Sequence, residues 1–311
     1  RLIAAGGEGM NTFEMGRLLG AMALLLAAQG PAFADALEGE ASSADILAAA
    51  DASDWLQLDQ DNLLYIELER GRVVVALSTS LAPRHVAQIK ALAREHFYDG
   101  LSFYRVIDGF VAQGGDIFEN REIRTAKKTM TAEFDEPAPD WLNFKPLADE
   151  DGYAAITGFV NGMPVGLDES AARAWHLHCA GAFAFGRNND RDSASTEFYI
   201  TLQPQRYLDR NMTVFGRVVQ GMEHLQALRR VQPAETPEDD LGETILSMRI
   251  GADMPEADRT ALEILRSDTP TFQRYVASRR NRPEEFFYFR PDYINVCDLP
   301  YPVREISDTG E

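Results

Sequence analysis

Histidine and cysteine side chains gather in the segment Trp175-His176-Leu177-His178-Cys179, which is the nearest approach of this sequence to a metal site. Imidazole and thiolate groups are the ligands that zinc prefers. On a strand, however, alternate side chains share a face, so His176 and His178 would point to one side and Cys179 to the other. We therefore favour structural histidines, and we expect neither a bound metal nor a cofactor.

The sequence lacks the short motifs that carry nucleotide, hydrolytic or redox chemistry. It has no glycine-rich phosphate loop, no dinucleotide-binding glycine fingerprint after a strand, no nucleophile elbow, no H-E-x-x-H motif and no C-x-x-C pair. Most cofactor-dependent and hydrolytic functions are therefore excluded.

Three sequence blocks, which follow one another along the chain, contain the residues that remain as candidates for function. They read F-Y-R-V-I-D-G-F-V-A-Q-G-G-D from Phe103 to Asp116, T-E-F-Y-I-T from Thr196 to Thr201, and Y-L-D-R-N-M-T-V-F-G from Tyr207 to Gly216. They resemble the cyclophilins, whose patterns there are F-H-R-[VI]-I-x-G-F-x-x-Q-G-G-D, S-Q-F-F-I-x and W-L-D-x-x-x-x-V-F-G. The resemblance spans residues 62–251 and is interrupted by an insert at about 117–180. It implies a mainly β fold, a closed eight-stranded antiparallel barrel capped by two helices, and cis/trans isomerisation of X-Pro peptide bonds.

The resemblance assigns catalytic roles to Arg105, Phe110 and Gln113. The barrier to isomerisation is the amide resonance, about 18–20 kcal/mol, which is lost when the bond twists and the prolyl nitrogen regains its lone pair. A guanidinium beside that nitrogen, here Arg105, would bond the twisted amide more strongly than the planar one. Gln113 would steady Arg105 and contact the substrate carbonyl, and Phe110 would form a wall of the proline pocket.

Further positions match the family's substrate-binding residues: Val111, Gly186, Arg187, Asn188, Glu197, Tyr199, Tyr207, Leu208 and Met212. Six positions at the expected site depart from the family pattern, and two of them are Val111 and Tyr199, where the family usually has Met and Phe. Tyr104 and Met212 stand where the family has His, Glu197 replaces Gln, and Tyr207 replaces the Trp that contacts cyclosporin. A carboxylate at position 197 could either orient Arg105 or compete with the substrate for it. The changes at 207 and 212 predict weakened inhibition by cyclosporin.

The elements that must position these residues follow from hydrophobic periodicity. Alternation over residues 62–77 predicts a hairpin, Pro83 opens a helix that ends near Tyr98, and further strands are expected around the three blocks. A short helix is expected at 222–228, and the C-terminal extension (252–311) is expected to be helical. Over 256–290 the expected apolar face holds Leu262, Leu265, Phe272, Tyr275 and Val276.

The beginning of the chain has the pattern of a secretory signal peptide. Arg17, the apolar run 18–28 and the A-x-A signature at 32–34 predict that residues 1–34 comprise a signal peptide and residues upstream of it, with an uncleaved anchor as the alternative. A leader at 35–61 follows, which is either mobile or a loosely docked helix. The apolar run is far shorter than the roughly 20 residues that span a bilayer, so we expect no membrane span after cleavage. The leader by itself predicts export, and the family resemblance implies that the location is the periplasm.

Charge and cysteine content limit the partners. The formal net charge of −19 disfavours nucleic acid, because a phosphate-binding surface needs basic residues. In an oxidising compartment Cys179 and Cys297 either form a disulfide or remain two buried thiols. We expect a monomer that binds proline-containing polypeptides. The alternative is a weakly catalytic or inactive proline-peptide-binding chaperone, in which the insert and the extension supply the main contacts.

Overall fold

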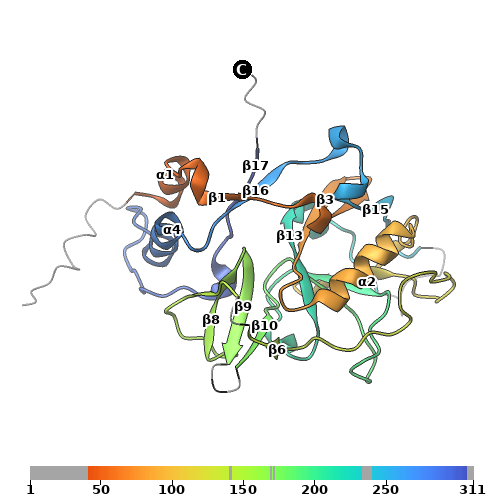
Figure 1. The fold of residues 1–311 in the computed structure, drawn as a ribbon. Helices are drawn as coiled ribbons and strands as arrows, with labels where there is room; N and C mark the ends of the chain where they lie inside the picture. The colour runs from red at the N-terminus through yellow and green to blue at the C-terminus, as the bar shows by residue number, and fades with distance from the viewer. Residues whose placement is uncertain (1–40, 140–141, 169, 171, 233–239, 307–311) are drawn as a thin grey trace, which may run out of the picture. The chain divides into compact units, whose positions relative to one another are not determined.

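The computed structural model describes residues 41–139, 142–168, 170, 172–232 and 240–306 (Figure 1). The predicted signal peptide (1–34), the first part of the predicted leader (35–40) and the end of the predicted tail (307–311) lie outside the described residues. In the part of the chain that is described, no helix is both long and apolar enough to cross a membrane.

Nine antiparallel strands of the described chain form the largest sheet. Their order is β14 (Glu243–Thr244), β4 (Ser102–Val106), β5 (Val111–Gly115), β12 (Phe198–Thr201), β11 (Ala182–Phe185), β13 (Val214–Gln220), β3 (Gly71–Leu77), β2 (Leu63–Leu68) and β15 (Ser247–Ile250). The sheet is strongly curled, which confirms the mainly β, cyclophilin-like prediction. It has nine strands where eight were expected, because the segment 243–250 forms one short strand at each edge. This order does not show closure, so a closed barrel stays a prediction.

Strand β2 is buried on both faces. Leu64 and Ile66 point into the largest apolar core, whereas Leu63 and Tyr65 pack with Leu262 of the C-terminal extension. Because successive side chains of a strand point to opposite faces, this burial requires apolar cover on each side of the sheet. The extension supplies the outer cover.

Two helices pack against the largest core, as predicted. In α2 (Pro83–Arg94) the residues Val86 and Ile89 are buried in this core, and in α3 (Met222–Gln226) Leu225 is buried there. Pro83 occupies the first turn of α2, where its missing N–H costs no helical hydrogen bond.

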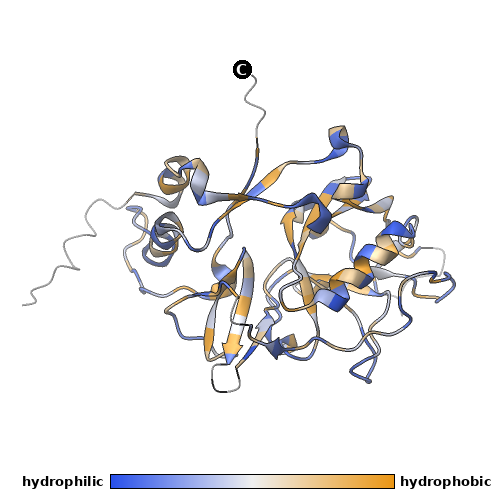
Figure 2. Ribbon diagram, viewed as in Figure 1, coloured by the Kyte–Doolittle hydropathy of each residue, from blue (hydrophilic) through white to orange (hydrophobic). Residues whose placement is uncertain are grey.

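The insert contains a sheet of its own. Five antiparallel strands follow in the order β6 (Glu136–Pro137), β10 (Arg173–His176), β9 (Met163–Asp168), β8 (Ile156–Val160) and β7 (Lys145–Pro146). Asn161 and Gly162 connect β8 to β9 and both have positive φ angles, as a tight two-residue hairpin turn requires. Figure 2 shows long hydrophobic stretches on β8 and β9 beside mostly hydrophilic connecting segments.

The C-terminal extension is only partly helical, so the prediction for Leu262 and Leu265 was wrong. These residues lie on β16 (Leu262–Leu265), the middle strand between β1 (Trp55–Gln57) and β17 (Val303–Glu305). Backbone hydrogen bonds on both sides hold β16 extended, and this outweighs the helix-like spacing of its leucines. The described part of the extension does contain one α-helix, α4 (Pro270–Asn281), and the burial of Phe272, Tyr275 and Val276 on it confirms that part of the prediction.

The predicted leader is ordered from Ala41 onward. It forms helix α1 (Ser43–Ala48) and strand β1. One apolar core joins it to the insert and the extension, with Ile46 and Trp55 from the leader, Phe159 from the insert and Phe272 from α4. Short 3-10 helices complete the described fold at Ala52–Asp54, Gln60–Asn62, Arg206–Leu208, Gly251–Asp253, Glu256–Asp258 and Val296–Asp298.

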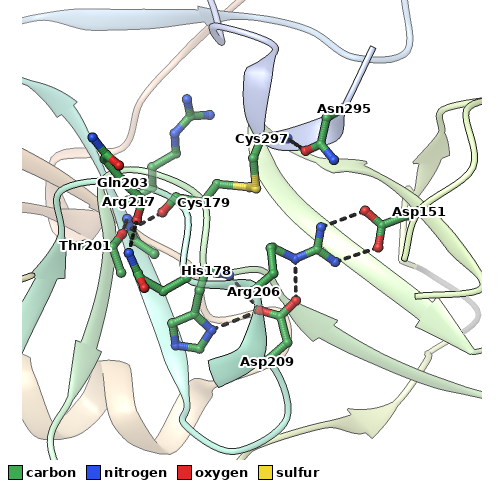
Figure 3. Close-up of a disulfide and its surroundings, with 12 residues drawn as sticks. Asp151, His178, Cys179, Thr201, Gln203, Arg206, Asp209, Arg217, Asn295 and Cys297 are labelled. Carbon is green, nitrogen blue, oxygen red and sulfur yellow. Dashed lines mark hydrogen bonds and ion pairs between the residues drawn. A yellow bond between two sulfur atoms is a disulfide. The ribbon is translucent and has the colours of Figure 1, made fainter. Parts of the chain in front are cut away.

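Cys179 and Cys297 form a disulfide in this structure (Figure 3). Their Cα atoms are 4.9 Å apart, and 118 positions separate them along the chain. Cys179 lies between β10 and β11, and Cys297 lies in the 3-10 helix Val296–Asp298. The bridge therefore ties the extension to the segment that enters the large sheet.

Candidate active site

A cavity of about 860 Å³ opens where β4, β5 and β12 meet the loops that follow β11 and the 3-10 helix Arg206–Leu208. The sequence-predicted residues that line it are Arg105, Phe110, Val111, Gln113, Gly186, Arg187, Asn188, Glu197, Tyr199, Leu208 and Met212. Tyr207 does not line it, and 57% of its surface is exposed. The structure thus brings all predicted site residues except Tyr207 around one cavity.

The hairpin of β4 and β5 places Arg105 and Gln113, the central pair of side chains, next to each other. Arg105 lies directly opposite Gln113 in the ladder, and Arg105 Nη1 donates a hydrogen bond of 3.2 Å to Gln113 Oε1. The ladder register shifts between Ser102 and Arg105, as at a β-bulge. A bulge re-aims side chains, which allows both Tyr104 and its neighbour Arg105 to lie on the side of Gln113.

The guanidinium of Arg105 is half-buried and holds few partners. Its central carbon lies 5.3 Å from the centre of the Phe110 ring, a cation–π distance. Among the described residues, Arg105 forms no ion pair with a carboxylate, and its guanidinium donates a side-chain hydrogen bond to Gln113. Donors of this guanidinium therefore remain to bind a substrate amide.

Glu197 does not bond Arg105. Instead, Tyr104 donates its hydroxyl proton to Glu197 Oε2, and Gln113 Nε2 donates to the Tyr104 oxygen at 2.6 Å. Burial, followed by the charges of Asp116 and Glu119, raises the pKa of Glu197 to about 7, although the hydrogen bond from Tyr104 opposes this shift. The sequence identified Tyr104 only as a departure from a pattern, whereas the structure places it inside the hydrogen-bonded site.

An apolar wall completes the cavity. Val111 and Tyr199 are buried there, and the half-buried Phe110, Leu208 and Met212 pack against them. This group can enclose a prolyl ring, because it combines apolar surface with the adjacent Arg105.

Met163 of β9 belongs to the same apolar cluster and was missed from the sequence. It comes from the insert, outside the three motif blocks. No local pattern around Met163 signals a place in this cluster, because that place depends on how β9 packs against the other members.

Tyr199 contacts a buried polar network of His178, Asp209, Arg206 and Asp151, and Figure 3 shows these four network residues. Its hydroxyl lies 3.0 Å from Nε2 of His178, whose Nδ1 lies 3.0 Å from Oδ1 of Asp209. Asp209 also accepts a hydrogen bond of 2.5 Å from Arg206, which forms two further bonds of 2.8 and 2.9 Å to Asp151 of the insert. His178 is therefore a structural histidine, and no group of three or more metal-ligating side chains stands ready for a metal in the described residues.

The segment 186–188 forms the rim of the cavity beside Glu197. The backbone N–H of Gly186 donates to the carbonyl oxygen of Glu197 at 2.6 Å. Arg187 is occupied by carbonyl groups, with Nε donating to Asn211 at 3.0 Å and Nη1 to Asn188 at 2.7 Å. These contacts fix the conformation of the rim beside the cavity.

Comparison with known proteins agrees with this geometry. Residues 63–250, about three fifths of the chain, match the family model described as cyclophilin type peptidyl-prolyl cis-trans isomerase/CLD. The chain belongs to this family, and it is a peptidyl-prolyl cis-trans isomerase by class.

Individual relatives support the same class. A probable peptidyl-prolyl cis-trans isomerase of Brucella suis biovar 1 is 31% identical over 196 residues, which are 63% of this chain and 85% of the relative. Peptidyl-prolyl cis-trans isomerase B of Bacillus subtilis is 33% identical over 160 residues, which are 51% of this chain and 85% of the relative.

A solved structure extends the similarity beyond the matched family region. The crystal structure of the cyclophilin AquaCyp293 from Hirschia baltica superposes with a TM-score of 0.68 at 29% identity, covering 86% of this chain and 98% of that one. Since the family model accounts for about three fifths of the chain, this likeness must include residues outside 63–250.

Proposed function

We propose that this protein is an exported, periplasmic prolyl isomerase that speeds the folding of other exported proteins, with Arg105 as its central catalytic residue. The single observation that carries this proposal is the Arg105–Gln113 pair. Among the described residues, the guanidinium has no carboxylate partner, and it lies in the cavity that has the apolar wall. Uncatalysed isomerisation takes tens to hundreds of seconds, so a catalyst of this step is useful to any folding chain with prolines.

The proposed mechanism is differential binding of the twisted amide. Arg105 donates to the prolyl nitrogen once the nitrogen regains its lone pair, while Gln113 holds the guanidinium in place. Phe110, Leu208 and Met212 enclose the prolyl ring. Charge-assisted hydrogen bonds of this kind contribute about 1.5–3 kcal/mol, or one to two decades of rate. No covalent intermediate is needed, because the reaction only rotates a bond.

Export is supported by two independent features. The first is the arrangement of Arg17, the apolar run 18–28 and the A-x-A signature at 32–34. The second is the pairing of Cys179 with Cys297, since disulfides persist in oxidising compartments. Cell fractionation with and without residues 1–34 tests this part of the proposal, and recovery of the full chain in the cytoplasm alone would contradict it.

Catalysis is tested with an X-Pro peptide by exchange spectroscopy, which needs no coupled protease. We expect the parent protein to speed isomerisation and Arg105→Ala to lower kcat/KM by about 10- to 100-fold. Arg229→Ala is the matched control, because Arg229 pairs with Asp240 on the exposed surface. An inactive parent, or equal activity of the two variants, would overturn the assignment of Arg105.

A second candidate function, retention of unfolded clients, is favoured by one observation. Phe286, Tyr288 and Phe289 of the extension are 81%, 102% and 79% exposed, which is unusual for aromatic side chains. Replacing these three residues by Ser should reduce suppression of client aggregation and leave peptide isomerisation unchanged. Unchanged suppression would remove the support for this function.

A further inference from the structure

We propose that Tyr104 and Glu197 are positioning residues that fix the side-chain amide of Gln113 so that its oxygen faces Arg105. The inference deepens the proposed function and rests on the role of Arg105 given there. It concerns the two departures from the family pattern that the structure places in direct contact with each other.

The four side chains form one directed series of hydrogen bonds. Arg105 Nη1 donates to Gln113 Oε1 at 3.2 Å, Gln113 Nε2 donates to the Tyr104 oxygen at 2.6 Å, and Tyr104 donates to Glu197 Oε2. A guanidinium only donates and an ionised carboxylate only accepts. The series therefore has a donor at one end and an acceptor at the other, and only one direction satisfies every member between them.

The direction matters because the two ends of a glutamine amide have nearly the same shape. If the amide of Gln113 were flipped, its NH₂ group would face the guanidinium of Arg105, and its oxygen would face the oxygen of Tyr104, whose proton is committed to Glu197. Both contacts would then be unmatched. Glu197 accepts the hydroxyl proton of Tyr104 and so leaves the Tyr104 oxygen free only to accept. Glu197 therefore opposes the flip of the Gln113 amide without contacting it.

The burial of Tyr104 favours one direction of hydrogen bonding in this series. Tyr104 is only 5% exposed, so water offers little competition for its hydroxyl. At the two positions the family pattern has His and Gln, each of which carries a donor as well as an acceptor. A carboxylate that only accepts hydrogen bonds, here Glu197 at the end of the series, is therefore a feature of this chain and not of the family pattern.

Protonation of Glu197 would remove the group that only accepts hydrogen bonds, because a carboxylic acid carries a donor of its own. The charged and titratable groups that face Glu197 are Tyr104, Asp116, Glu119 and the buried Tyr98. The pKa of about 7 at Glu197 places the change within the range in which the enzyme can be assayed. As the pH falls through 7, the acceptor end is lost and turnover should decrease.

The test compares Glu197→Gln, Tyr104→Phe and the double variant with the parent, and uses Glu223→Gln as the matched control. Glu223 lies on α3 and its side chain is 74% exposed. We expect each single variant to lower kcat about 5- to 10-fold at pH 8 with little change in KM, because the missing contact positions Arg105 and does not touch the substrate. The double variant should be no worse than the poorer single variant, since both break the same series.

The pH profile adds a readout that a merely structural role would not move. The parent should lose activity between pH 8 and 6, whereas Glu197→Gln should be flat over this range. Parent-like rates and profiles in both single variants, together with loss of activity in Arg105→Ala, would overturn the inference while the proposed function stands.

A spectroscopic readout decides the case of an inactive parent, in which the proposed function itself fails. The side-chain amide signals of Gln113 should then shift with pH near 7 in the parent and in Glu223→Gln, and should not shift in Glu197→Gln. A Gln113 signal that is insensitive to both pH and Glu197→Gln would overturn the inference.

Discussion

The hydroxyl of Tyr199 lies 3.0 Å from the ring of His178, so a wall of the candidate active site is anchored to a residue that has no exposed surface. His178 in turn contacts Asp209, and the series continues through Arg206 to Asp151 (Figure 3). A carboxylate of the insert is thereby connected to the cavity through buried polar groups.

Tyr199→Phe should therefore destabilise the protein with little effect on catalysis. The variant leaves Nε2 of His178 buried without its partner, which costs about 1–3 kcal/mol, while the aromatic ring still lines the cavity. Urea unfolding followed by circular dichroism measures the loss. Tyr207→Phe is the control, because its exposed ring makes an effect below about 0.5 kcal/mol the expectation. Equal stability of the two variants would contradict the anchoring role.

Arg206→Met should have a larger effect on stability. Its guanidinium lies between Asp151 and Asp209, whose side chains are only 3% and 4% exposed. Removing one partner of a buried ion pair leaves uncompensated charge and costs about 3–5 kcal/mol. The comparison is Arg229→Met, which breaks the exposed pair with Asp240 and should cost at most about 1 kcal/mol. If both variants unfold at the same urea concentration, the network does not stabilise the fold as described.

The large sheet was predictable because its strands have local signals. Alternation around Leu64 and Ile66, together with a tight turn before Gly71, indicates a hairpin without any tertiary information. The strand β16 was not predictable in this way. Leu262 and Leu265 are three residues apart, which fits a helix face, and only pairing with β1 and β17 from distant parts of the chain makes this segment extended.

In the site, too, some contacts have local sequence signals and others depend on distant parts of the chain. Arg105 and Gln113 were identified from one continuous motif, and they meet because a single hairpin pairs them. The contact of Tyr104 with Glu197 joins residues 93 positions apart and depends on the register shift in β4. The sequence alone led us to expect Glu197 beside Arg105, and neither the bulge nor the intervening Gln113 amide had a local signature.

Reduction of the disulfide should lower the stability of the parent protein. In the chain-entropy model, a bridge between residues 118 positions apart stabilises the fold by about 4–5 kcal/mol. We expect dithiothreitol to lower the urea midpoint of the parent to that of Cys179→Ser/Cys297→Ser, and to leave the double variant unchanged. A parent that unfolds at the same midpoint with and without the reductant would show that the bridge does not form in solution.

The titration of Glu197 predicts how stability depends on pH. Its pKa in the folded protein is about 7, above the ordinary value of 4.5, mainly because burial disfavours the carboxylate. A raised pKa means that the folded state binds the proton more tightly than the unfolded state. The stabilising contribution of the protonated group is therefore complete below about pH 4.5 and is lost as the pH rises to about 7.

Glu197→Gln cannot ionise and does not undergo this loss. The free energy of unfolding of the parent, measured relative to this variant, should fall between pH 4.5 and 7 by at most about 3 kcal/mol, and should change little above that range. Urea titrations at half-unit pH steps measure the difference, and Glu223→Gln, which removes an exposed carboxylate, should track the parent throughout. A constant difference between the parent and Glu197→Gln would mean that Glu197 titrates normally, and that the acceptor end of the hydrogen-bond series persists into acid.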